Sequence, residues 1–163
     1  MYITLPSNVD APSYNATNTR SHYITPLEQP LVLKSPYKIR VAEILYPLDW
    51  AYANGNAPGK DQRFFLSCDL FDGKRLANAG AYVGGSGCAV RHSAIFAWVP
   101  EEASSGYKTD SVLKGFNDWY WVDCGIPVTR VRVQIQDYKG RYITFKNGTV
   151  IVTLEIQNGV TKG

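Results

Sequence analysis

The sequence is poor in the residues on which metal centres and many catalytic sites depend. Its 163 residues include two histidines and three cysteines, and Cys68, Cys88 and Cys124 show no Cys-x-x-Cys spacing. His22 and His92 lie far apart in the chain, so a metal site is not expected. The hydrolase and protease motifs GxSxG and HExxH are missing as well. We therefore expect no enzymatic activity, no cofactor and three free buried thiols. A single disulfide between two of the three cysteines is an alternative that the sequence does not decide.

Charged residues and long apolar runs are also scarce. Asp, Glu, Lys and Arg make up 19% of the chain, and the formal net charge is only +3. A dedicated nucleic-acid binder carries a basic stripe, and because none is present no specific nucleic-acid partner is expected. No apolar run is long enough to span a membrane. The N-terminus lacks the charged and apolar regions of a signal peptide, so we expect synthesis in the host cell cytoplasm.

Aromatic residues, in contrast, are abundant at 13%, and tyrosine is the most frequent of them. Aromatic and β-branched residues favour strands. The segment Tyr37–Pro47 begins with alternating apolar and charged residues and then becomes apolar on both faces. This pattern predicts a strand in the middle of a packed sheet, ended by its proline. Shorter strands are predicted at residues 2–5, 21–25 and 31–33, each next to a proline.

The second half of the chain follows the same alternating pattern. A long strand is predicted at residues 88–99 and one short helical turn at 111–116, while Asn147-Gly148 predicts a hairpin turn. Alternation in three further segments predicts inward-facing residues, namely Phe64, Leu66, Cys68 and Leu70, then Val131, Val133 and Ile135, then Val150, Val152, Leu154 and Ile156. About eight antiparallel strands without a long helix predict one all-β sandwich domain over residues 1–163. Alternation alone does not separate a jelly roll from an immunoglobulin-like or lectin sandwich.

The order of short motifs in the first fifty residues resembles a known family. These motifs are Leu5-Pro6-Ser7-Asn8, Asn18-Thr19, Tyr23, Pro26-Leu27, Pro30-Leu31, Tyr37, Glu43-Ile44, Tyr46-Pro47 and Trp50. They resemble the N-terminal signature of the single jelly-roll minor capsid proteins of Polinton elements, adintoviruses and virophage-like viruses. A second stretch, from Gly140 to Ile156, resembles the closing strands of that family. The resemblance implies a single jelly-roll β-sandwich.

The same resemblance implies a structural role in an icosahedral virion. Proteins of this family form the pentameric vertex, or penton, of the shell. The expected partners are four further copies of the chain in a homopentamer and a separate major capsid protein, with a spike or receptor as an additional partner. The segment from Ser7 to Arg20 has too few apolar residues to build its own core. We therefore expect it to be an arm that contacts another subunit, with Tyr14 and Arg20 as anchors.

Four further aromatic residues are candidates for interface contacts. These are Trp50, Tyr52, Trp119 and Trp121. Alternation predicts that Trp119 and Trp121 share one face of a strand, opposite Val122. A core or subunit contact is the favoured interpretation of this pair, because aromatics bring a large gain on burial. The alternative is an exposed sugar-stacking platform, which would make the protein a carbohydrate- or receptor-binding module used in host attachment.

Overall fold

The computed structural model describes eleven stretches of the chain. They are residues 1–7, 17–34, 36–48, 50–51, 63–71, 81–83, 89–91, 96–98, 111–122, 127–137 and 140–158. Within these stretches the protein is all-β, and its regular elements are antiparallel strands and one 3-10 turn, η1 (Asp69–Phe71). The prediction of an all-β sandwich is confirmed.

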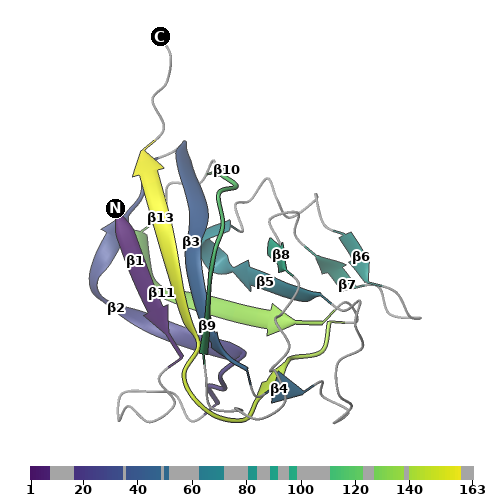
Figure 1. The fold of residues 1–163 in the computed structure, drawn as a ribbon. Helices are drawn as coiled ribbons and strands as arrows, with labels where there is room; N and C mark the ends of the chain where they lie inside the picture. Colours follow the sequence, from purple (N-terminus) through teal and green to yellow (C-terminus); the bar gives the residue numbers. More distant parts are fainter. Residues whose placement is uncertain are drawn as a thin grey trace.

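The first sheet is built around β3, which has the bounds that the sequence predicts. It contains β1 (Tyr2–Pro6), β13 (Ile151–Asn158), β3 (Tyr37–Pro47) and β10 (Tyr120–Val122) in that order, and β9 (Ser111–Gly115) pairs with the second half of β3. In Figure 1, β1, β13 and β3 run steeply side by side. Because β3 is paired on both edges, the predicted central position of this strand is confirmed.

The second sheet packs against the first. It contains β2 (His22–Val32), β11 (Pro127–Gln136), β5 (Phe64–Cys68) and β8 (Phe96–Trp98) in that order. Figure 1 shows β11 passing behind β13 and β3. The described residues also form two short ribbons, one of β4 (Trp50–Ala51) with β12 (Thr144–Phe145) and the other of β6 (Ala81–Val83) with β7 (Ala89–Arg91).

The pairing between strands is nested. If β9 and β10 count as two segments of one strand, because both pair with β3, each sheet has four main strands within the described stretches. In chain order, the first main strand then pairs with the eighth, the second with the seventh, the third with the sixth and the fourth with the fifth. Two further pairings, β13 with β3 and β11 with β5, join these ribbons within their sheets.

The core lies between the two sheets and includes the inward-facing residues that alternation predicts. Val131, Val133 and Ile135 of β11 are fully buried, as are Ile39 and Val41 of β3. Phe64, Leu66, Cys68, Leu70, Val150, Val152, Leu154 and Ile156 are buried with them. The Tyr23 hydroxyl donates to the Leu5 carbonyl at 2.9 Å, and the Tyr37 hydroxyl donates to the Leu70 carbonyl at 2.8 Å. These bonds satisfy buried polar groups across the sandwich.

Three predictions about single elements are wrong. The strand expected to stop before Pro26 continues to Val32, because β2 is a sheet edge in the described fold and tolerates proline there. The helical turn expected at 111–116 is instead strand β9, stabilised by its ladder with β3. The long strand expected at 88–99 is split, since Ala89–Arg91 pairs with β6 and Phe96–Trp98 pairs with β5.

The predicted hairpin at Asn147-Gly148 is also wrong, although a turn exists there. Gly148 has a φ of 73°, and a Cβ added to it would lie 3.0 Å from Cγ of Pro47. Glycine therefore allows both the turn and the close approach to the end of β3. The strands on either side do not pair with each other, because β12 pairs with β4 while β13 pairs with β1 and β3.

Candidate functional site

One candidate site lies on the outward face of the first sheet. We call it the outer aromatic face and define it by Lys38 and Arg40 of β3, Glu155 of β13, and Trp119 and Trp121 at β10. The strand register places Glu155 opposite Arg40 and Lys38 opposite Trp121. Alternation turns these side chains away from the core, since Ile39 between the two cations is buried.

Each cation on this face lies over an indole ring. The Lys38 ammonium is 4.6 Å from the ring centroid of Trp121, and the Arg40 guanidinium is 5.0 Å from that of Trp119. Both distances are in the range of cation–π attraction. Trp121 is 56% exposed, whereas Val122 is buried. The predicted common face of the two tryptophans is thus confirmed, and this face of the sheet points to solvent rather than into the core.

An ion pair fixes the charged part of the outer aromatic face. Arg40 Nε donates to Glu155 Oε2 at 2.7 Å. Its Nη1 also donates to the side-chain oxygen of Asn117 at 3.3 Å. Burial alone would raise the pKa of Glu155, but hydrogen bonds from Arg40 and Gln157 outweigh it and hold the pKa below its ordinary value. The carboxylate is therefore ionised at neutral pH.

Two of the other predicted interface residues, Trp50 and Arg20, lie away from this face. Trp50 is 7% exposed and its ring packs edge-on against Phe64, with 4.4 Å between the ring centroids. Trp50 is therefore part of the core rather than of an exposed contact surface. Tyr14 and Tyr52 lie outside the described residues, and Arg20 lies at a second site. Most of the predicted arm, residues 8–16, also lies outside the described part of the chain.

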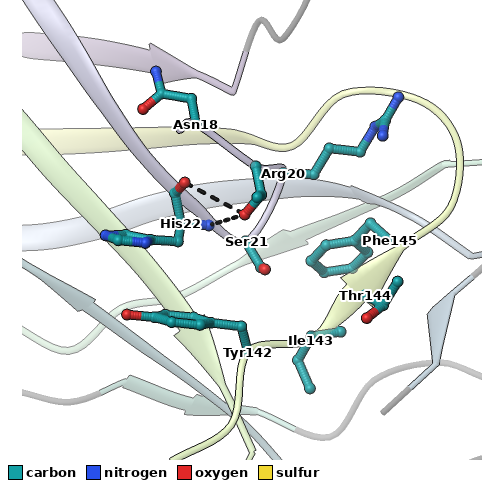
Figure 2. A pocket seen from close by; sticks show the side chains of 9 residues that line it. Asn18, Arg20, Ser21, His22, Tyr142, Ile143, Thr144 and Phe145 are labelled. Carbon is teal, nitrogen blue, oxygen red and sulfur yellow. Dashed lines mark hydrogen bonds between the residues drawn. The ribbon is translucent and has the colours of Figure 1, made fainter. Parts of the chain in front are cut away.

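This second site is an open groove of about 340 Å³. Its lining consists of Asn18, Thr19, Arg20, Ser21, His22, Tyr142, Ile143, Thr144 and Phe145. The segment before and at the start of β2 forms one wall, and the segment that leads into β12 forms the other (Figure 2). Arg20 Nε donates to the Gly148 carbonyl at 2.6 Å, next to the end of β3. From the rise of a strand, this end is about 30 Å along β3 from Lys38.

Two rings close one side of the groove. The rings of His22 and Tyr142 are parallel within 1°, with centroids 4.8 Å apart (Figure 2). Gln134 Nε2 donates to the Tyr142 hydroxyl at 2.8 Å, which holds the phenol in place. Burial, and secondly the charge of Arg132, lower the pKa of His22. The imidazole is therefore mostly neutral at pH 7 and can donate or accept a hydrogen bond.

The loop that forms the first wall is held by its own side chains. The Asn18 amide donates to the Ile24 carbonyl and accepts from the Ile24 N–H, both at 3.2 Å. The Thr19 hydroxyl accepts from the His22 N–H at 3.1 Å, a bond drawn in Figure 2. These local bonds satisfy backbone N–H and carbonyl groups at the start of β2. The groove is consequently formed before any ligand arrives.

Sequence patterns identify only part of these two sites. The tryptophan pair and Arg20 are found from residue type, whereas Lys38, Glu155, Ser21 and Tyr142 are not. Each of the latter is an ordinary polar or aromatic residue on an alternating strand or in a turn. Their roles depend on partners more than eighty residues away, so a single sequence carries no signal for them.

The described residues also limit the chemistry of the two sites. No group of three or more His, Cys, Asp or Glu side chains is close enough to hold a metal ion within this part of the chain. No helix in the same stretches is long and apolar enough to cross a bilayer. Comparison of the chain with protein-family models, curated proteins and solved structures finds no match in any of the three. The case for a function therefore rests on the chain's own geometry.

Proposed function

We propose that this protein is a jelly-roll capsid subunit that forms the five-fold vertex of an icosahedral shell. It assembles as a homopentamer and contacts a separate major capsid protein of the same virion. Its role is structural and needs no catalytic group. The observation that carries the proposal is the nested pairing of the eight main strands.

Nested pairing supports the jelly roll within the class of β-sandwiches. A jelly roll has eight strands arranged as two Greek keys in two sheets. It forms when a long antiparallel ribbon, with its ends at strands one and eight and its turn between strands four and five, wraps around a barrel-like core. This protein pairs first with eighth, second with seventh, third with sixth and fourth with fifth. A sandwich built from simple hairpins would pair consecutive strands instead.

An apolar row on the surface supports assembly with neighbours. The register places Pro6, Ile151, Leu45 and Leu113 side by side across β1, β13, β3 and β9 on the outward face. Leu113 is 61% exposed. Scattered exposed apolar residues are normal, but a contiguous row across four strands is typical of a contact surface. Neighbouring subunits or the major capsid protein would cover this row.

Assembly of the purified protein tests the proposal. We expect light scattering to give the mass of five chains and image classes to have five-fold symmetry. Replacing Leu113 and Ile151 by Asp should yield monomers with an unchanged fold, because the row is absent from the core. The Gln29→Asp variant carries a new acid at an exposed position of β2 in the other sheet, and as a control it should assemble like the wild type. A wild-type protein that stays monomeric at high concentration and is missing from particle vertices would refute the proposal.

The outer aromatic face favours a second candidate function, binding of a carbohydrate receptor. An exposed indole can stack on a sugar ring, and Asn117, Lys38 and Arg40 beside the tryptophans supply hydrogen-bond donors. The two functions are compatible, because a vertex protein is well placed to contact a host. A glycan array tests this candidate, with the Trp121→Ala variant expected to lose all signal while keeping the wild-type melting temperature. An array without wild-type hits would remove it.

A further inference from the structure

We infer that the groove between residues 18–22 and 142–145 binds an extended acidic peptide from a partner protein. An acidic side chain of the peptide meets Arg20, its backbone meets the Ser21 hydroxyl, and an apolar side chain next to the acid packs on the Tyr142 ring. This site is separate from the outer aromatic face and from the apolar row. The inference holds whether or not the protein forms a vertex.

The Ser21 hydroxyl is the first observation that points to a ligand. Ser21 is 3% exposed, and its side chain points into the groove in Figure 2. Its backbone carbonyl accepts from the Ile135 N–H at 2.7 Å, but its hydroxyl has no hydrogen-bond partner among the described residues. Buried hydroxyls are nearly always paired, by protein, water or ligand. A peptide amide at this position would supply the missing partner.

The charges around the groove are the second observation. None of the nine described residues that line it is acidic, whereas Arg20 is cationic and Arg132 lies close enough to affect His22. Arg20 forms no ion pair with a carboxylate in the described part of the chain. Its bond to the Gly148 carbonyl uses only Nε, so the other guanidinium N–H groups remain able to donate. An acidic group therefore complements the groove, and a basic peptide does not.

The shape of the groove favours a peptide over a free ion. At about 340 Å³ it is large enough for two or three residues and much larger than a single anion. Tyr142 lines it and is 36% exposed, which gives an apolar side chain of the peptide a ring surface to pack on. The backbone of the groove wall is already held by Asn18 and Thr19, so binding needs little ordering of the protein.

A matched pair of peptides tests the inference. The probes are acetyl-Leu-Asp-Leu-amide and acetyl-Leu-Asn-Leu-amide, which differ only in the charge of the central side chain. Binding is followed by NMR through the His22 imidazole and Ile143 methyl signals. We expect the Asp peptide to bind about tenfold more tightly than the Asn peptide, in line with a charge-assisted hydrogen bond. Arg20→Gln should remove this difference, whereas Arg63→Gln, which removes an exposed charge outside the groove, should retain it.

The Ser21→Ala variant separates a binding role from a structural one. It should weaken both peptides several-fold and leave the melting temperature unchanged or raised, because it removes a buried hydroxyl that has no partner. Equal binding of the two peptides would refute recognition of the acid. If inorganic phosphate produces the same shifts and competes with the Asp peptide at equal concentration, the groove is a general anion site. That result would refute the inference of a peptide ligand. Absence of any shift at His22 and Ile143 with either peptide would overturn the inference altogether.

Discussion

Truncation of Ile44 in β3 is the sharpest test of how the sandwich is stabilised. Ile44 is fully buried, and β3 is paired on both edges, so the backbone around it has little freedom to collapse into a cavity. Ile44→Ala removes three carbons, worth about 2.4 kcal/mol at roughly 0.8 kcal/mol each. The cavity adds to this loss, so we expect the free energy of unfolding to fall by about 3–5 kcal/mol. Val133→Ala, in the facing sheet, removes two carbons and should cost about 2–3 kcal/mol.

Urea denaturation at fixed protein concentration measures both losses. For a chain of this length, a loss of 3 kcal/mol lowers the melting temperature by roughly 6–12 °C. Val32→Ala is the matched control, because this residue is 67% exposed. It should change the unfolding free energy by less than about 0.5 kcal/mol. The face assignments would be refuted by losses under about 0.5 kcal/mol at both Ile44 and Val133, or by a loss at Val32 as large as that at Ile44.

Three further predictions concern polar contacts and the arm. Because the pKa of Glu155 is lowered in the folded protein, the stabilisation from its pair with Arg40 is present above the carboxyl's ordinary pKa and is lost as the pH falls through the lowered value. Glu155→Gln should therefore flatten the acid limb of a stability-versus-pH curve, and an unchanged limb would contradict the pairing. Ser7 is fully buried and accepts from the Val150 N–H at 2.9 Å, so Ser7→Ala should lower the unfolding free energy by about 1–3 kcal/mol in urea titration, and no loss would argue against this bond. Deletion of residues 8–16 should leave the melting temperature near the wild-type value but reduce incorporation into particles, whereas normal incorporation would disprove the arm's contact with another subunit.

Local alternation explains why much of the fold is predictable from the sequence. The period of two along a strand assigns each residue to a face without reference to any other segment. This suffices to identify Tyr37–Pro47 as a central strand and to place Val131, Val133 and Ile135 in the core. It also puts Trp119 and Trp121 on one side of their strand. A face, however, is turned inward or outward only relative to a second sheet, so alternation left open whether these tryptophans were buried.

Tertiary structure decides everything that depends on which strands are neighbours. Residues 111–115 form a strand because β3 offers them a ladder, and Asn147-Gly148 fails to make a hairpin because β12 and β13 have partners elsewhere. Closing a long loop costs entropy that only the complete set of contacts can offset, so such pairings are not encoded in any short segment. The Arg40–Glu155 pair, 115 residues apart in the chain, and the groove formed by residues 18–22 and 142–145 exist only once the register of the distant strands is set.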